Sequence, residues 1–126
     1  MAIFDTSIII DYLRGKKEAK EVVEKFGDAV GIGMSTISCY EIMIGTKSYD
    51  ELEIGSFFQR INAYPLDMKS VVEAAIFYRE LRKRGKQLSI ADTLILGTAK
   101  ANDEQFITMD KDFEGTYDKL VVLKQK

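Results

Sequence analysis

Short apolar runs alternate with helical patterns along the chain, and this alternation restricts the fold more than any other feature. Five runs of β-forming residues are expected to be strands, at residues 2–4, 29–34, 61–66, 105–108 and 120–123. Strands that are separated by helices are typical of a parallel sheet with crossover helices. The predicted fold class is therefore α/β, built on a five-stranded parallel sheet.

The helical segments carry recognisable start and stop signals. Helices are expected over residues 8–13, 36–44, 68–84 and 90–101, with a further helix that ends near residue 60. The expected N-caps are Ser35, either Ser48 or Asp50, Asp67 and Ser89. Gly45 and Gly85 stand where two helices should end. Pro65 would remove a hydrogen-bond donor from the third strand, which favours the edge of the sheet.

Composition predicts one folded domain over residues 1–126. A chain of 126 residues with 46% hydrophobic residues can build one core but not two. Cys39 is the only cysteine, so no internal disulfide can form, which suits a reducing cytoplasm. No apolar run approaches the roughly 20 residues of a membrane span, and residues 1–5 do not resemble a signal peptide. We therefore expect a soluble, cytoplasmic protein.

The chain contains no histidine, which removes the usual general base, the Ser-His-Asp triad and the commonest transition-metal ligand. Any chemistry must therefore depend on carboxylates, with a hard cation as the natural cofactor. The formal net charge of -2 argues against a general binder of polyanions. Contact with a nucleic acid would therefore need a local basic patch.

Four acids in apolar surroundings are the candidates for such chemistry: Asp5, Glu41, Asp92 and Asp110. Asp5 follows the first strand, and in a parallel sheet this position points into the crevice where ligands bind. Glu41 has mostly apolar or small neighbours on its helix face, and a buried carboxylate is usually neutral, paired or metal-bound. Asp112 lies two residues after Asp110, so both carboxylates can reach one cation.

Helix capping is the structural alternative for two of these acids. Asp5 could serve only as an N-cap, in competition with Thr6 and Ser7, and Ser89 with Asp92 matches a capping box. Bringing the acids together without a cation is unfavourable, because like charges about 5 Å apart repel by roughly 3 kcal/mol at an effective dielectric near 20. Ligands that are all oxygen atoms favour magnesium or manganese over zinc.

A basic segment precedes Asp92. Arg79, Arg82, Lys83 and Lys86 have the spacing i, i+3, i+4 and i+7 of one helix face. A solvated helix face is the simpler interpretation, although the position would suit a phosphate backbone. Several aromatic residues are expected in the core or in subunit contacts rather than under stacked bases: Phe57, Phe58, Tyr64, Phe77 and Tyr78.

The order and spacing of four segments resemble those of a known family, the PIN-domain ribonucleases, and in particular the VapC-type toxins of toxin-antitoxin pairs. The segments are residues 3–7 (IFDTS), 35–45 (STISCYEIMIG), 89–99 (SIADTLILGTA) and 108–113 (TMDKDF). The likeness extends over essentially the whole chain. It implies a three-layer α/β/α fold with a parallel sheet in the order 3-2-1-4-5.

The same resemblance implies an activity and a set of roles. It implies an endoribonuclease that depends on Mg²⁺ or Mn²⁺, with Asp5, Glu41, Asp92 and Asp110 as the acidic quartet and Asp112 as a fifth metal ligand. Thr6 and Thr108 match hydroxyl positions beside the first and fourth acids and are candidates for substrate binding, as are the four cations above. The implied partners are an RNA substrate, a second copy of the chain and a cognate antitoxin whose tail occupies the groove near the acids.

The hypothesis for the mechanism is hydrolysis of an RNA phosphodiester by a metal-activated water. Asp5 and Asp92 would bind the ion, Asp110 would hold the same ion or a second one, and Glu41 would accept or orient the proton of the water. Two alternatives stay open. One is a magnesium-binding phospho-receiver domain with Asp67 as phosphoacceptor. The other is a non-catalytic binding module in which the acids hold a structural ion.

Overall fold

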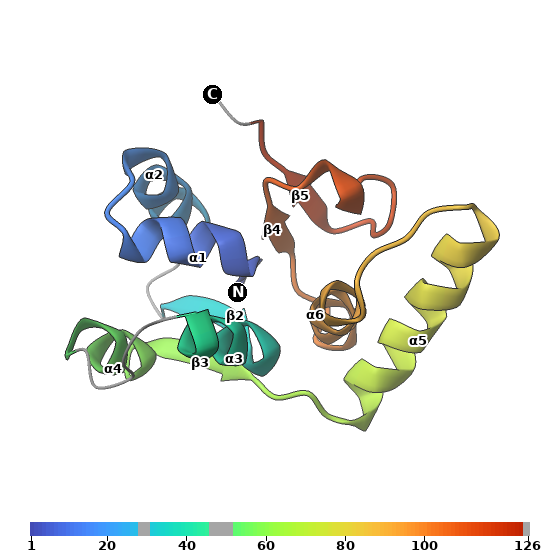
Figure 1. Ribbon diagram of the computed structural model, residues 1–126, viewed down its shortest axis with the longest axis horizontal. Coiled ribbons are helices and arrows are strands. Elements are labelled where there is room, and N and C mark those ends of the chain that lie inside the picture. Colours follow the sequence, from blue (N-terminus) through green and yellow to red (C-terminus); the bar gives the residue numbers. More distant parts are fainter. Residues whose placement is uncertain (28–30, 46–51, 125–126) are drawn as a thin grey trace.

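The five expected strands form a single parallel sheet in the order β3-β2-β1-β4-β5 (Figure 1). The computed structural model of the chain describes residues 1–27, 31–45 and 52–124. Its strands are β1 (Ile3–Phe4), β2 (Ile32–Ser35), β3 (Ile61–Tyr64), β4 (Phe106–Thr108) and β5 (Leu120–Val122). The predicted fold class and strand order are confirmed.

Helices cover both faces of this sheet, and the alternation of side chains along the central strands shows why. Ala2 and Phe4 belong to a buried cluster that also includes side chains of α1 (Thr6–Leu13), α2 (Lys17–Phe26), α3 (Thr36–Gly45) and α4 (Leu52–Phe58). Ile3 points to the opposite face and joins α5 (Met68–Lys83) and α6 (Ile90–Ala101). Because successive strand residues face opposite sides, β1 is buried on both faces, which gives three layers.

The ends of α5 and α6 follow the predicted signals closely. Asp67 caps α5 by accepting the N–H of Ser70 at 2.9 Å, and Ser89 caps α6 by accepting the N–H of Asp92 at 3.0 Å. Gly85 adopts a φ of 71° directly after the end of α5, in the left-handed region that terminates many helices. The helix α6 has the predicted bounds, whereas α5 ends at residue 83, one residue earlier than expected.

Some elements differ from the prediction or lie outside the described residues. The helix α2 was not expected, although Ala19, Val22, Val23 and Phe26 have the spacing of an apolar helix stripe. The expected caps at residues 48 and 50 and the expected strand start at residue 29 lie outside the described residues. Pro65 directly follows β3, which is an edge strand as predicted.

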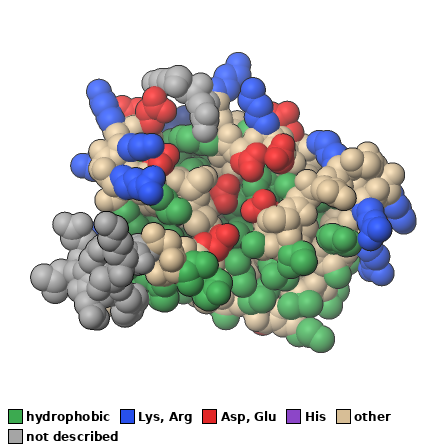
Figure 2. Space-filling view, in the orientation of Figure 1, with side chains coloured by type: hydrophobic (Ala, Val, Ile, Leu, Met, Phe, Trp, Pro, Cys, Tyr) green, Lys and Arg blue, Asp and Glu red, His purple; other side chains and the backbone are tan. Residues whose placement is uncertain are grey.

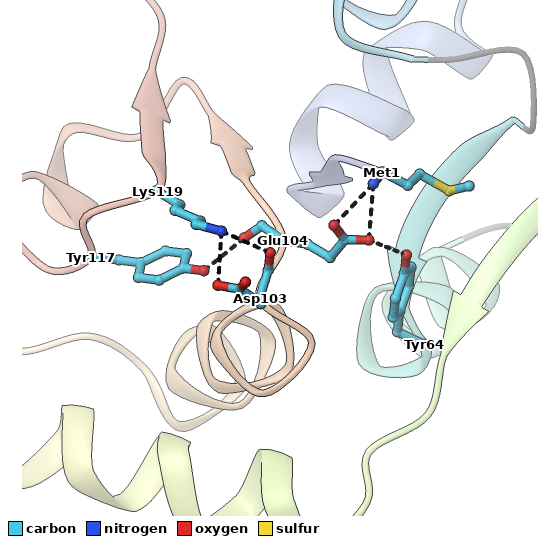
Figure 3. A network of polar contacts seen from close by, with 6 residues as sticks. All are labelled: Met1, Tyr64, Asp103, Glu104, Tyr117 and Lys119. Atoms are coloured by element: carbon cyan, nitrogen blue, oxygen red, sulfur yellow. Dashed lines mark hydrogen bonds and ion pairs between the residues drawn. The ribbon is translucent and has the colours of Figure 1, made fainter.

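One polar network joins segments from both ends of the chain (Figure 3). The carboxylate of Glu104, between α6 and β4, accepts hydrogen bonds from the amino group of Met1 at 2.9 and 3.0 Å and from the hydroxyl of Tyr64 at 2.6 Å. The hydroxyl of Tyr117 donates to the backbone carbonyl of Glu104 at 2.8 Å. The network therefore links the residues before β1 and β4 to the last residue of β3 and to the segment before β5.

The helices α5 and α6 approach each other closely at Gly97. A Cβ atom at this position would lie 2.6 Å from the backbone nitrogen of Ala74 and 2.6 Å from the carbonyl oxygen of Ser70. Only a glycine allows the two backbones to come this near.

Even α5, the longest of these helices at 16 residues, is too short for a bilayer, and no helix among the described residues could cross one.

Candidate functional site

The candidate acids gather where the connections of the sheet reverse direction. Asp5 follows β1 and Asp110 follows β4, which are neighbouring strands. From β1 the chain continues to β2 on one side, and from β4 it continues to β5 on the other side. This switch point is where open parallel sheets bind their ligands. Asp92 lies in the first turn of α6 and Glu41 lies on α3. Figure 2 shows acidic side chains gathered near the centre of this face, between the positions of α1 and α6 in Figure 1.

Asp5 is both a helix cap and a buried member of this group. Asp5 is only 7% exposed. Its Oδ1 accepts a hydrogen bond from the backbone N–H of Thr6 at 2.8 Å, and its Oδ2 accepts one from the hydroxyl of Thr108 at 2.7 Å. Burial, together with the nearby charges of Asp92 and Asp110, raises the pKa of Asp5 from 3.8 to about 6 despite these hydrogen bonds. Capping alone therefore does not account for this residue.

Thr108 connects the first acid to the fourth. Its side chain is completely buried, and its hydroxyl oxygen accepts the backbone N–H of Asp110 at 3.0 Å while the hydroxyl donates to Asp5. Oδ1 of Asp110 in turn accepts the backbone N–H of Asp112 at 2.9 Å, which caps a short 3-10 helix (Lys111–Phe113). Asp112 itself is exposed at the rim of the group.

Glu41 is held by a row of hydroxyl groups. The hydroxyl of Thr6 donates to Oε1 of Glu41 at 2.7 Å. The Thr6 hydroxyl has a single proton, and an ionised carboxylate can only accept, so this proton goes to Glu41. Ser38 therefore donates to Thr6, and the distance from its Oγ to Oγ1 of Thr6 is 2.8 Å. The hydroxyl of Ser35 donates to Ser38 at 3.2 Å. We did not expect Ser38 in the site, although its position three residues before Glu41 on α3 is the signal that could have shown it.

Asp92 shares the electrostatic environment of the other acids. It is partly buried, and burial is the main reason that its pKa is raised, with its hydrogen bond to Ser89 acting in the opposite direction. The charges of Asp110, Glu41 and Asp112 raise the pKa of Asp92 further. Acids from four different parts of the chain therefore lie close enough to repel one another, although Asp92 also belongs to a capped helix end.

The chemistry of these side chains fits a hard divalent cation. Partly buried carboxylates that repel one another are stabilised by such an ion, and oxygen is the ligand that magnesium and manganese prefer. Among the described residues, however, no three Asp, Glu or Cys side chains are placed closely enough to hold a metal ion. The fit therefore depends on the kind of ligands and on their shared environment rather than on a finished coordination shell.

The predicted stripe of four cations is wrong in one respect. Because α5 ends at residue 83, Lys86 lies beyond the helix, and its ammonium group donates to the carbonyl oxygen of Glu114 at 2.8 Å. Arg79, Arg82 and Lys83 are exposed on α5.

Among the expected core aromatics Phe57 is buried, whereas Tyr78 is 43% exposed.

Asp67, the phosphoacceptor in the alternative interpretation, is occupied by a structural role. It is exposed at the start of α5 and accepts both the backbone N–H and the hydroxyl of Ser70, at 2.9 and 2.7 Å. These two hydrogen bonds lower the pKa of Asp67. The described contacts of Asp67 are therefore those of a helix cap.

Comparisons with known proteins agree with this geometry. The chain is 26% identical to Ribonuclease VapC1 of Methanocaldococcus jannaschii over 110 residues, which cover 86% of this chain and 75% of that protein. A toxin-antitoxin complex from Klebsiella pneumoniae contains a chain with a TM-score of 0.83 and 28% identity, over 97% of both chains. A chain of VapBC2 from Rickettsia felis, bound to promoter DNA, shares the fold with a TM-score of 0.82 at 18% identity, covering 98% of this chain and 97% of that one.

The family assignment rests on a match to a family model. The model of the PIN domain family matches residues 2–119, which include all the candidate acids and every strand except β5. The three-layer fold and the strand order agree with that assignment. The chain belongs to the PIN domain family.

Proposed function

We propose that this chain is an endoribonuclease that hydrolyses RNA phosphodiester bonds with Mg²⁺ or Mn²⁺, and that it is the toxin of a toxin-antitoxin pair. We also propose that residues 1–126 form one PIN domain. The observation that carries the proposal is the grouping of Asp5, Glu41, Asp92 and Asp110 at the switch point of a PIN domain without histidine. The relative named as a ribonuclease and the neighbour in a toxin-antitoxin complex support the same activity.

Asp5, Asp92 and Asp110 would hold the metal ion, with Asp112 as a further ligand at the rim. When bound, the ion supplies a more acidic water and neutralises negative charge that develops on the phosphate. Asp5 is suited to this role because it is buried and fixed by two hydrogen bonds, so its carboxylate loses little freedom on binding. Thr108 positions Asp5 and Asp110 and would act through them rather than on the RNA.

Glu41 would accept the proton of the attacking water. As the water oxygen forms its bond to phosphorus, its proton would move to Glu41, the bond from phosphorus to the leaving oxygen would break, and the leaving oxygen would take up a proton from solvent. Thr6 holds one carboxylate oxygen of Glu41, which leaves the other oxygen to take the proton. No imidazole is needed, which agrees with the absence of histidine from the sequence.

Cleavage of a panel of structured RNAs tests this function. The wild-type protein is assayed with Mg²⁺, with Mn²⁺ and with excess EDTA, next to Asp5→Asn and Asp92→Asn. We expect cleavage only with metal, and we expect both variants to lose it. The matched control is Asp118→Asn, which removes an exposed acid outside the group and should leave cleavage unchanged. Undiminished cleavage by Asp5→Asn and Asp92→Asn would contradict the assigned roles.

The remaining alternatives give different results in simple assays. A non-catalytic module would gain stability from the metal but would cleave no RNA. A phospho-receiver would gain one phosphate on Asp67 after incubation with acetyl phosphate, which intact-mass measurement detects. We expect no added phosphate, because the carboxylate of Asp67 is engaged with Ser70.

The proposed partner is a cognate antitoxin, encoded together with the toxin. Support comes from the toxin-antitoxin complex of Klebsiella pneumoniae, which contains a chain 28% identical to this one. Co-purification of the two gene products and loss of RNA cleavage in the complex test the pairing. RNA cleavage that is equally fast in the presence of a bound antitoxin would contradict its role as an inhibitor.

We also propose that two copies of the chain associate through the outer face of α5. Met68, Val72 and Ile76 lie on this face and are 75%, 50% and 41% exposed. They have the spacing i, i+4 and i+8 of a continuous apolar stripe, which a second copy would bury. Sedimentation analysis should show a dimer that Val72→Glu dissociates; a wild-type monomer at high concentration would refute the dimer.

A further inference from the structure

A cavity of about 240 Å³ lies between the C-terminal half of α5 and the start of α6. It is lined by Tyr78, Leu81, Arg82, Lys86, Gln87, Leu88, Ser89, Ile90 and Thr93. Pockets for drug-sized ligands usually have volumes of roughly 300–1,000 Å³. This cavity is smaller, so its size suits a single planar group such as one nucleobase.

The apolar part of the lining can stack on a base. Tyr78 is 43% exposed and Ile90 is 72% exposed, so both side chains are accessible to a ligand at the cavity. Leu81 and Leu88 are buried behind them and form the apolar floor. An accessible aromatic ring next to an apolar floor is the arrangement that single-stranded RNA uses for stacking, because each base presents an apolar face.

The polar part of the lining can hold a phosphate and read a base edge. Arg82 and Lys86 bring two positive charges to the cavity, and among the described residues no carboxylate pairs with either of them. The contact of Lys86 with the carbonyl of Glu114 occupies one of its three N–H donors and anchors the side chain. Gln87 adds an amide with both a donor and an acceptor, which can pair with the edge of a base.

The cavity adjoins the acidic group through the first turn of α6. Ser89 lines the cavity and its Oγ accepts the backbone N–H of Asp92, so the wall of the cavity and a proposed metal ligand belong to the same turn. Thr93, the next residue, is buried at the cavity and donates its hydroxyl to the carbonyl oxygen of Ile90 at 2.8 Å. An α-helix with side chains is about 10 Å wide, which places the two sites within the reach of neighbouring nucleotides.

We infer that this cavity binds one nucleotide of the RNA strand beside the scissile phosphate, with its base against Tyr78 and its phosphate near Arg82 and Lys86. The inference rests on the proposed ribonuclease function and adds a site that selects the substrate. It also gives the basic residues a defined place, since the acidic group repels the RNA backbone and the cations on its flank attract it.

A second cavity, of about 210 Å³, is a weaker candidate for the same task. It lies between α2 and the ends of β4 and β5, and its lining includes Glu18, Glu21, Lys25 and Lys124. The two carboxylates cancel the two cations there, so the cavity offers no net attraction for phosphate. Charge therefore favours the cavity at Tyr78.

Binding and cleavage measurements on matched variants test the inference. A short fluorescent single-stranded RNA of mixed sequence is titrated in EDTA with the wild type, Tyr78→Ala, Tyr78→Phe, Arg82→Gln and Lys69→Gln, at several salt concentrations. Metal-dependent cleavage of a structured RNA gives KM and kcat for each protein. Lys69 is the control for Arg82, because it is an exposed cation of the same helix that does not line the cavity.

The variants should separate stacking from charge. Tyr78→Ala should weaken RNA binding roughly 5- to 100-fold with little change in salt dependence, and Tyr78→Phe should restore it. Arg82→Gln should lower the slope of log affinity against log salt by about 1. KM should rise for Tyr78→Ala and Arg82→Gln while kcat stays near that of the wild type, since the lost contacts are made equally in the ground and transition states. Lys69→Gln should match the wild type.

Failure of this inference can be distinguished from failure of the proposed function. If the wild type cleaves RNA but Tyr78→Ala and Arg82→Gln keep its affinity, salt slope and KM, the nucleotide site is overturned and the ribonuclease stands. If these variants keep the RNA parameters but escape inhibition by the antitoxin, the cavity serves a protein partner and the inference is again overturned. If the wild type cleaves no RNA with either metal, both proposals fail.

Discussion

The hydroxyl of Thr108 donates to a carboxylate oxygen of Asp5 at 2.7 Å, although 103 positions separate the two residues in the sequence. The bond joins the ends of β1 and β4, the two central strands at the switch point. The same Thr108 oxygen accepts the backbone N–H of Asp110. One buried threonine thus sets the positions of two acids that arrive from distant parts of the chain.

Replacing Thr108 by valine should reduce RNA cleavage while the fold is kept. Valine has nearly the same shape but leaves the carboxylate of Asp5 and the N–H of Asp110 without their partner, and lost contacts of this kind behind metal ligands typically cost 10- to 100-fold in activity. Thr108→Ser should recover most of the activity, because it restores the hydroxyl. Circular dichroism and cleavage rates check both variants; full activity of Thr108→Val would show that the bond is dispensable.

The metal-free protein should lose stability as the pH rises through the range in which Asp5 ionises. The pKa of Asp5 is raised from 3.8 to about 6, so between these values the folded state binds more protons than the unfolded state. The free energy of unfolding therefore falls with rising pH, by at most about 3 kcal/mol at neutral pH. Urea unfolding in EDTA at pH 4, 5, 6 and 7 measures this contribution.

Asp5→Asn should remove that part of the pH dependence, because asparagine does not ionise. The variant should be more stable than the wild type at pH 7 and equally stable near pH 4 in metal-free buffer. Asp67 gives the opposite sign, since hydrogen bonds from Ser70 lower its pKa and its contribution is lost as the pH falls. The assignment would be contradicted if the free energy of unfolding rose steadily between pH 4 and pH 7 in both the wild type and Asp5→Asn.

Binding of Mn²⁺ should reverse the loss of stability that the repelling acids cause in the folded protein. A ligand that binds only the folded state at 100 times its Kd raises the free energy of unfolding by about 2.7 kcal/mol. The melting temperature of the wild type should therefore rise with Mn²⁺ and return with EDTA, whereas Asp5→Asn should respond weakly. Asp118→Asn should behave as the wild type. Calorimetry that detects no manganese uptake by the folded wild type would end the metal hypothesis.

Two glycine-to-alanine substitutions should have opposite effects on stability. At Gly97 the new Cβ would lie 2.6 Å from backbone atoms of α5, so Gly97→Ala should force the helices apart and cost about 1–3 kcal/mol or more. At Gly55, inside α4, nothing lies within 4 Å, so Gly55→Ala should stabilise by roughly 0.5–1 kcal/mol. Chemical denaturation compares the two; equal effects would contradict the close contact between α5 and α6.

Much of the fold could be predicted from local sequence, because caps and apolar runs act over a few residues. Ser89 and Asp67 cap the helices at which they were expected, and β4, the strand after α6, begins within one residue of its predicted start. The helix α2 was not predicted because its charged residues mask a narrow apolar stripe. Lys86 was placed on a helix face from its spacing alone, although the helix end predicted at Gly85 already lay before it, and the structure ends α5 at residue 83.

The site could be predicted only in part. The acids were recognised as a group, but the pairing of Thr108 with Asp5 and of Thr6 with Glu41 depends on how distant segments meet. Ser38 belongs to the same network and carries only a weak signal, its spacing from Glu41. The cavity at Tyr78 depends on the packing of α5 against the turn before α6, which no local pattern reveals.

The pairing of β1 with β4 has a consequence for the timing of activity during synthesis. A ribosome must deliver β4 and the residues that follow it before Asp5 and Asp110 can meet, since Phe4 pairs with Ile107. Contacts of such long sequence separation form late, after local helices and neighbouring strands. A growing chain therefore carries no assembled acidic centre until the residues up to Asp110 have left the ribosome.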